Sequence, residues 1–275
     1  MTSPKLKQIC IGVGDPIVHS LSPAMHNAGY KALGLEDEFV YLNAQVPKGE
    51  IAGVIKGALS MRFRGVTCTL PHKQDVIPFL DELDQAAERI GAVNTVVFQN
   101  GRSRGFNTDW QGLVGALEEL TPLREKKVAL LGAGGTARAA LYGLKERGAE
   151  PLIFNRNLAN AETLAKAFQA QALPLSEIAQ ISDCEIIINT TPVGMYPNIE
   201  ASLVPVKLLH PNQIVLDAVY YPAETRLLSD AKKAGARPVP GVRMLLHQAF
   251  PQFEHYTGKS APKSAMEGAL YENQR

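Results

Sequence analysis

The sequence has few cysteines, almost no excess of charge of either sign and no long apolar run. Cys10, Cys68 and Cys184 are three cysteines in 275 residues, and their odd number and wide spacing fit neither a disulfide framework nor a zinc site. With 28 basic and 27 acidic residues the net charge is +1, which argues against electrostatic binding of nucleic acid or of a membrane surface. No segment has the length of a signal-peptide core or a membrane span. We therefore expect a cytoplasmic protein with small buried thiols, no metal site, and no nucleic-acid or membrane partner.

Apolar and β-branched runs are present, and they alternate with helical stretches along most of the chain. This alternation predicts α/β layers with mostly parallel strands. Ser22 followed by proline predicts one helix start, Pro71 predicts another, and Pro78 should end or kink that second helix. The letters QNG between two strand-like runs predict a hairpin. The expected strands are QICIGV, EFVYLNAQ, FRGVTCT, AVNTVVF, KKVALLG, PLIFN, CEIIINT, QIVLDAV and RPVPG.

The glycine-rich turn GAGGTARAA lies near the middle of the chain and divides it. A dinucleotide-binding domain begins with the strand before such a turn, so the residues ahead of it must form another domain. The amphipathic segment that begins at Gly241 predicts a last helix that packs back on this first domain. We expect a substrate-binding domain from residues 1–109 and 241–275, a Rossmann-like dinucleotide-binding domain over residues 110–240, and an active site in the cleft between them.

The segment KKVALLGAGGTARAA has the strand, turn and helix of a dinucleotide site. Gly132 permits the tight turn, Gly134 lets a pyrophosphate approach the backbone, and Ala137 allows close packing of helix on strand. The next strand ends at Asn155 and Arg156, without the acidic residue that holds the ribose 2′-OH in NAD sites. Arginine suits a 2′-phosphate, so the sequence favours NADP over NAD. The alternatives are glycines with a purely structural role and a solvated arginine at a strand end.

Polar residues stand at three further strand-to-helix junctions. Lys73 ends GVTCTLPHK, Asp109 lies in GFNTDWQG, and Ser20 and Ser22 lie in HSLSPAMHN. Each has a structural alternative: a surface lysine, an N-cap at Asn107 or Asp109, and an N-cap at Ser22. A lysine at a helix amino terminus is nevertheless disfavoured by the helix dipole. Three such groups at strand ends favour a common site.

Together these segments resemble the shikimate dehydrogenase family over about residues 14–258. The resemblance implies two α/β domains and a reversible NADP-dependent reduction of 3-dehydroshikimate to shikimate, a step of chorismate and aromatic amino acid biosynthesis. The motifs that carry it are S-x-S-P-x-x-H-N from Ser20, T-x-P-H-K from Thr69, A-V-N-T from Ala92, G-x-N-T-D from Gly105, G-A-G-G from Gly132, N-x-T-P-x-G-M from Asn189, D-x-V-Y from Asp217 and M-L-x-x-Q from Met244.

The resemblance also implies site residues, with Lys73 and Asp109 as the catalytic pair. Lys73 would give a proton to the ketone oxygen and take it back in the reverse reaction. The expected substrate-binding residues are Ser20, Ser22, Thr67, Thr69, Lys73, Asn94, Asp109, Tyr220 and Gln248. The resemblance places Gly241 and Met244 near the nicotinamide. The expected cofactor-binding residues are Gly132, Ala133, Gly134, Gly135, Thr136, Asn155, Arg156, Asn160, Thr190, Ala218, Gly241 and Met244.

Two positions depart from the family pattern. Many members have asparagine where this chain has Thr67, and typical NADP-using members have a second basic residue where it has Asn160. Two alternative functions stay open. One is a quinate or dual quinate/shikimate dehydrogenase that uses NAD, and the other is a catalytically silent NADP-binding regulator. Ser22 favours shikimate, because quinate-preferring relatives tend to have threonine there, and Lys73 with Asp109 argues against the regulator. We expect a small-molecule substrate as the partner, and a monomer or homodimer.

Overall fold

The computed structural model describes residues 6–273, which form two compact units, each built on a six-stranded sheet. Unit 1 contains the described residues up to Thr108 and those from Gln248 on, and unit 2 is Asp109–His247. Helix α9 (Gly241–Thr257) therefore belongs to both units. The outer limits of the predicted substrate-binding domain, residues 1 and 275, lie outside the described residues.

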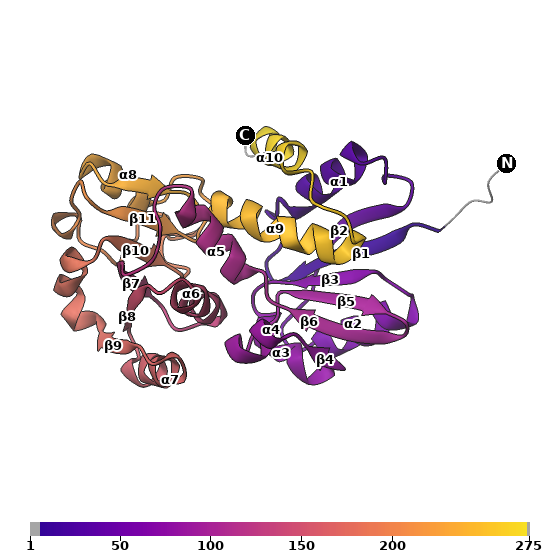
Figure 1. Cartoon of the computed structure of the whole chain (residues 1–275), viewed down its shortest axis with the longest axis horizontal. Helices are drawn as coiled ribbons and strands as arrows, with labels where there is room; N and C mark the ends of the chain where they lie inside the picture. Colours follow the sequence, from indigo (N-terminus) through magenta and orange to yellow (C-terminus); the bar gives the residue numbers. More distant parts are fainter. Residues whose placement is uncertain (1–5, 274–275) are drawn as a thin grey trace. The chain divides into compact units, whose positions relative to one another are not determined.

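The sheet of unit 1 combines parallel and antiparallel pairs (Figure 1). Parallel pairing joins β1 to β2 and β3, and β4 to β6, whereas β5 pairs antiparallel with β3 and β6. The β5–β6 hairpin turns at Asn100 and Gly101, both with positive φ, as QNG predicts. In the order β2-β1-β3-β5-β6-β4, the strands are Phe39–Gln45, Gln8–Gly14, Gly65–Cys68, Thr95–Gln99, Arg102–Phe106 and Glu82–Leu83.

Two helices of unit 1 begin where the sequence predicts them. Helix α1 begins at Ser22, and α3 begins directly after Pro71 and ends before a 3₁₀ turn that contains Pro78. Helix α10 was not predicted; it lies beside α1 and buries Met266 and Leu270 (Figure 1). The helices are α1 (Ser22–Ala32), α2 (Ile51–Ser60), α3 (His72–Asp75), α4 (Gln85–Ile90), the second part of α9 and α10 (Lys263–Glu272), with the 3₁₀ turn η1 (Ile77–Phe79).

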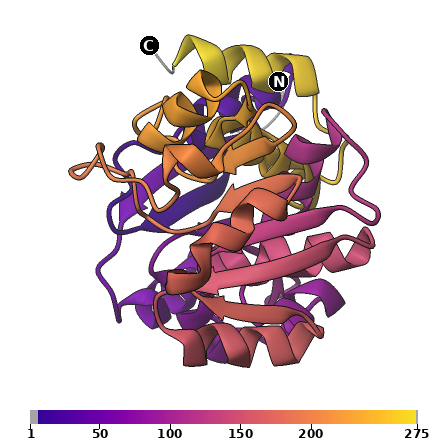
Figure 2. The same ribbon diagram turned by 90° about the vertical axis from the view of Figure 1, so that its left-hand side faces the viewer.

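Every strand pair in unit 2 is parallel, as a Rossmann-like domain requires. Counted from β7 in chain order, the sheet has the strand order 3-2-1-4-5-6, which is that of dinucleotide-binding folds. Figure 2 turns this unit toward the viewer. In the order β12-β11-β10-β7-β8-β9, the strands are Arg237–Val239, Ile214–Asp217, Ile186–Asn189, Lys127–Leu131, Glu150–Asn155 and Gln171–Pro174.

Strands β10 and β11 of unit 2 are buried along their whole length, as in parallel sheets that are covered on both faces. All four residues of β10 and of β11 are buried. Residues 6–273 contain no helix with the length and hydropathy of a membrane span. The remaining elements are α5 (Asp109–Glu118), α6 (Gly135–Glu146), α7 (Leu158–Phe168), α8 (Arg226–Lys233), the start of α9, and the 3₁₀ segments η2 (Leu175–Asp183) and η3 (Val206–Leu208).

Replacement of Gly65 by alanine tests how closely α9 packs on the sheet of unit 1. A Cβ at Gly65 would lie 2.6 Å from Cδ1 of Tyr256 and 2.8 Å from the carbonyl oxygen of Val96. Since Tyr256 is fully buried, Gly65→Ala should lower the free energy of unfolding by about 1–3 kcal/mol, measured by urea denaturation. Gly53→Ala in α2 is the matched control, because a Cβ there meets no atom within 4 Å. Equal stability of Gly65→Ala and wild type would contradict this packing.

Candidate functional site

Asn94 is the centre of a buried polar cluster in unit 1, directly before β5. Its Oδ1 accepts hydrogen bonds from the N–H of Thr108 and the hydroxyl of Thr95, each at 2.8 Å. Its Nδ2 donates to Oγ1 of Thr108 at 2.9 Å and to Oε1 of Gln248 at 3.2 Å. All four side chains are buried. The structure thus brings together two of the predicted substrate-binding residues, Asn94 and Gln248.

Lys73 lies in α3, just beyond the carboxyl end of β3. Its carbonyl oxygen accepts the N–H of Val93 at 2.7 Å, and the N–H of Cys68 donates to the carbonyl of Asn94 at 2.8 Å. These bonds fix the backbone of Lys73 beside the segment that leads into the Asn94 cluster. The preceding His72 is fully buried, with Nε2 2.8 Å from a backbone carbonyl, which agrees with a structural role.

The predicted serines lie together at the start of α1. Oγ of Ser20 accepts the N–H of Ser22 at 3.4 Å, and Ser22 is buried. The N-cap residue of α1 is Leu21, which makes no side-chain cap bond, so Ser22 is not an N-cap. Thr69 directly follows β3 and is half-buried; its N–H donates to Val13 of β1 at 2.9 Å. Ser20 and Thr69 thus lie in the segments that follow β1 and β3, and Ser22 is the first residue of the helix after β1.

Thr67 has a contact in the protein core. Its Oγ1 lies 2.8 Å from the hydroxyl of Tyr256, which is fully buried in α9. This hydroxyl pair joins β3 to α9 within unit 1. The role of Thr67 in substrate binding therefore stays a prediction, and its observed contact is a hydrogen bond to a buried tyrosine of the same unit.

The glycine turn of unit 2 has the geometry that the sequence predicts. Gly132 has φ +112°, and a Cβ there would lie 2.8 Å from Oγ1 of Thr190. Gly134 is the N-cap of α6, and no side chain caps that helix. A Cβ on Gly134 would meet no atom within 4 Å, whereas Ala137 is completely buried. The backbone at the start of α6 therefore faces open space, where a phosphate could approach its N–H groups.

The segment after β8 is exposed and forms the N-cap of α7. Nδ2 of Asn155 donates to the carbonyl of Asn157 at 2.9 Å, and Oδ1 of Asn157 accepts the N–H of Asn160 at 3.4 Å. Arg156 and Asn160 are exposed. Arg156 thus directly follows β8. This strand pairs with β7, the strand that leads into the glycine turn.

Thr190 joins the segment after β10 to the end of β7. Its Oγ1 donates to the carbonyl of Leu131 at 2.6 Å, and its N–H donates to the same carbonyl at 3.0 Å. Leu131 directly precedes Gly132, so this predicted cofactor residue lies against the glycine turn.

Asp217, the last residue of β11, accepts hydrogen bonds from three segments of unit 2. Its Oδ1 accepts Nδ2 of Asn189 at 2.9 Å and the N–H of Val219 at 3.0 Å, and its Oδ2 accepts the hydroxyl of Thr225 at 2.6 Å. Asp217 is completely buried, and this burial raises the pKa of its carboxyl group to about 6 although all three partners lower it. Gly241 packs on the same strand end, since a Cβ there would lie 2.6 Å from the carbonyl oxygen of Asp217.

The remaining predicted residues belong to unit 2. Asp109 is the first residue of α5 and is buried, and Met244 is buried in the first turns of α9. Tyr220 is half-buried after β11, and burial raises the pKa of its hydroxyl. The turn residues Ala133, Gly135 and Thr136 and the strand-end residue Ala218 are half-buried.

Several polar residues of these clusters were not predicted as site residues. Thr95, Thr108 and Gln252 belong to the network around Asn94, and Thr225 belongs to the network around Asp217. Asn189 and Asp217 stand in quoted motifs but had no assigned role. The usable signal was a polar residue at the first or last position of a buried strand, as at Thr95, Asn189 and Asp217. Among residues 6–273, no group of three or more His, Cys, Asp or Glu side chains is placed to hold a metal ion.

Three family models match the chain. They are described as the shikimate dehydrogenase substrate binding domain over residues 13–96, shikimate / quinate 5-dehydrogenase over residues 115–201, and the shikimate 5′-dehydrogenase C-terminal domain over residues 241–271. The first model covers Lys73 and Asn94, and the second covers the glycine turn.

Relatives and solved structures agree with these models. The chain is 45% identical to a shikimate dehydrogenase (NADP(+)) of Methanopyrus kandleri, over 96% of this chain and 94% of the relative. A crystal structure of a shikimate dehydrogenase in complex with NADP⁺ has a TM-score of 0.92 and 35% identity, over 98% of this chain and 96% of that one. A Thermus thermophilus shikimate 5-dehydrogenase in complex with NADP(H) and shikimate has a TM-score of 0.90 and 37% identity, over 97% of this chain and 99% of that one.

The raised pKa of Asp217 predicts how stability depends on pH. Because burial raises this pKa from 3.8 to about 6, the folded state binds the proton more tightly than the unfolded state does. The contribution of Asp217 to stability is therefore full below pH 3.8 and is lost as the pH rises through about 6. Asp217→Asn has no titratable carboxyl group at this position. The free energy of unfolding of the variant, relative to that of wild type, should therefore rise by roughly 3 kcal/mol between acid and neutral pH. Urea denaturation of both proteins at several pH values measures this; a difference that stays constant with pH would contradict it.

Proposed function

The chain belongs to the shikimate dehydrogenase family, and we propose that it catalyses the reversible NADP-dependent reduction of 3-dehydroshikimate to shikimate in chorismate and aromatic amino acid biosynthesis. One observation supports this above all: Lys73 is fixed at a strand end beside a buried cluster of amide and hydroxyl groups. Unit 2 also has a glycine turn with free space at Gly134, and its sheet has the strand order of dinucleotide-binding folds.

The Asn94 cluster suits a substrate that carries several hydroxyl groups. Amide side chains both donate and accept hydrogen bonds, so Asn94 and Gln248 could each exchange a bond within this cluster for one to a substrate hydroxyl, in either sense. Ser20 and Ser22 supply hydroxyl donors for a carboxylate. We assign shikimate binding to these four residues and to Thr69 and Tyr220. Thr67 is assigned a smaller part in substrate binding.

The cofactor-binding elements fit a dinucleotide with a 2′-phosphate. The uncapped start of α6 and the free space at Gly134 suit a pyrophosphate. Exposed Arg156, directly after β8, suits the 2′-phosphate. Asn155 is uncharged, so no carboxylate at that position would repel the phosphate. Asn160 adds no second charge, so the preference for NADP over NAD depends on Arg156.

Reduction of the ketone requires a hydride at carbon and a proton at oxygen. When bound, NADPH supplies the hydride. In our proposal the Lys73 ammonium donates the proton to the carbonyl oxygen and becomes an amine, which takes the proton back from the shikimate hydroxyl in the reverse direction. Asp109 is assigned the role of orienting Lys73 and stabilising its charged form. Atoms and charge balance, because the ketone gains one hydride and one proton.

The location and assembly of the protein form a smaller part of the proposal. Cys10, Cys68 and Cys184 are free and buried, which suits the reducing cytoplasm. We propose that the enzyme works there on a small-molecule substrate, as a monomer or a homodimer.

Replacement of Lys73 tests the proposed chemistry. Lys73→Met keeps the aliphatic stem and removes the ammonium, so kcat for NADPH-linked turnover should fall by about two to four orders of magnitude. Binding of NADPH should be unchanged. Asp109→Asn should impair the same step, and the double variant should be scarcely slower than the slower single variant.

Lys56→Met in α2 is the matched control, since Lys56 is exposed and lies outside both clusters. Its kcat should equal that of wild type. The absorbance of NADPH gives the rate of wild type and of all four variants. A Lys73→Met enzyme with near-normal kcat would contradict the assignment of Lys73 as the proton donor.

A further inference from the structure

Asp217 is completely buried at the carboxyl end of β11, yet the proposed chemistry gives it no task. We propose that Asp217 is a positioning residue: it holds the segments after β10 and β11 in the arrangement that the nicotinamide half of NADP requires. This inference rests on the proposed function and deepens it. Asp217 is not assigned a contact with substrate or cofactor.

The carboxylate gathers three separate segments of unit 2 at one point. Nδ2 of Asn189 donates from the end of β10, the N–H of Val219 donates from the segment after β11, and the hydroxyl of Thr225 donates from the N-cap of α8. A carboxylate only accepts hydrogen bonds, so it can satisfy all three donors at once. The three partners are therefore fixed relative to one another.

Asn189 extends this order into the turn that follows β10. Its Oδ1 accepts the N–H and the hydroxyl of Thr191, at 3.0 and 2.7 Å, and its Nδ2 also lies 3.2 Å from the carbonyl oxygen of Val193. The N–H of Val193 in turn donates to Oγ1 of Thr191 at 3.2 Å. The turn is thus folded around the Asn189 amide, whose orientation Asp217 sets. Thr190, a proposed cofactor residue, lies within it.

The segment after β11 carries two more of the proposed site residues. Val219, whose N–H donates to Asp217, lies between Ala218 and Tyr220. Gly241 packs on the same backbone, because a Cβ there would lie within 2.8 Å of the carbonyl oxygens at positions 217, 218 and 219. The proposed site residues Thr190, Ala218, Tyr220 and Gly241 are therefore all next to atoms that Asp217 holds.

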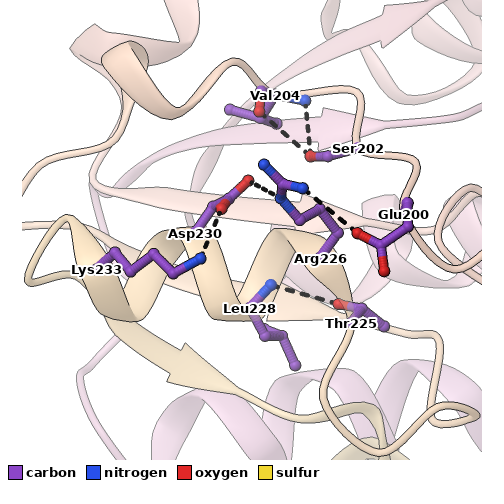
Figure 3. A network of polar contacts seen from close by, with 8 residues as sticks. All are labelled: Glu200, Ser202, Val204, Thr225, Arg226, Leu228, Asp230 and Lys233. Carbon is purple, nitrogen blue, oxygen red and sulfur yellow. Dashed lines mark hydrogen bonds and ion pairs between the residues drawn. The ribbon is translucent and has the colours of Figure 1, made fainter.

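The start of α8 makes a buried contact with Asp217 through Thr225 and more exposed contacts through Arg226. Thr225 caps α8 by accepting the N–H of Leu228 at 3.3 Å, as it also donates to Asp217. Figure 3 shows the more exposed contacts: Arg226, the next residue, reaches Glu200 at 3.4 Å and Asp230 at 2.8 Å. The Arg226–Glu200 pair is largely exposed and adds little, since water screens it. The buried contact with Asp217 is what positions the strand ends.

Two substitutions of Asp217 separate position from mere stability. Asp217→Ala leaves the three donors buried without an acceptor. Asp217→Asn keeps one oxygen for Asn189 and Val219, and its amide can donate to Oγ1 of Thr225, so it is the conservative variant. Asp230→Asn is the matched control, because Asp230 is also a buried acid of unit 2 but pairs with Arg226 and Lys233 on α8 (Figure 3).

The experiment measures dissociation constants of each protein for NADPH and for 2′-phospho-ADP-ribose, which lacks the nicotinamide, together with kcat and KM. For Asp217→Ala we expect NADPH binding to weaken and kcat to fall by about ten- to hundredfold, as a misplaced site predicts. Binding of 2′-phospho-ADP-ribose should be unchanged, since it uses the ends of β7 and β8. Asp217→Asn should restore most of the loss, and Asp230→Asn should match wild type in every constant.

Wild-type affinities and kcat in Asp217→Ala, with only a lower melting temperature, would overturn the inference, as would equal weakening of both ligands. If Asp217→Ala does not fold, Thr225→Val is measured in its place, because it removes the donor to Oδ2. An unchanged ratio of the two affinities in Thr225→Val would then overturn the inference. A wild-type chain that neither binds NADPH nor reduces 3-dehydroshikimate would instead overturn the proposed function, whatever the variants do.

Discussion

The hydrogen bonds that converge on Asn94 in unit 1 and on Asp217 in unit 2 satisfy polar groups that water does not reach. Each residue lies at the end of an otherwise apolar segment, where a polar group without a partner would cost free energy. Each therefore draws several backbone segments to one point. The loops that carry the proposed site are ordered because these two buried groups have to be paired.

The chain passes between the two units at two points, and each point lies beside residues of the proposed site. Thr108, bonded to Asn94, directly precedes Asp109, the first residue of α5. Gln248, also bonded to Asn94, continues the helix that begins at Gly241 against the end of β11. The Asn94 cluster of unit 1, the proposed substrate-binding cluster, is thus linked covalently through α5 and α9 to proposed site residues of unit 2.

Much of this could be predicted from local sequence pattern. The β-branched runs predicted the central strands, QNG predicted the hairpin, and the turn at Gly132 predicted a Rossmann-like domain, since each signal lies within a few adjacent residues. The two-residue strand β4 and helix α10 were not predicted, because β4 is too short to show a period and α10 is stabilised by packing on α1. The polar networks were also beyond local pattern: Gln252 bonds to Thr95 across 157 positions of sequence. A single strand-end residue shows that a polar group is present, but only the fold shows its partner.

The activity itself is tested most directly by initial rates of the unmodified chain with shikimate and with quinate, each with NADP⁺ and with NAD⁺. We expect the highest kcat/KM for shikimate with NADP⁺. Position 155 is not acidic and position 156 is arginine, which favours NADP⁺, and Ser22 favours shikimate. Quinate should be slower by roughly a hundredfold, because a pocket discriminates only modestly against one added hydroxyl. Higher kcat/KM with quinate or with NAD⁺, or no reduction of either nucleotide, would contradict the account.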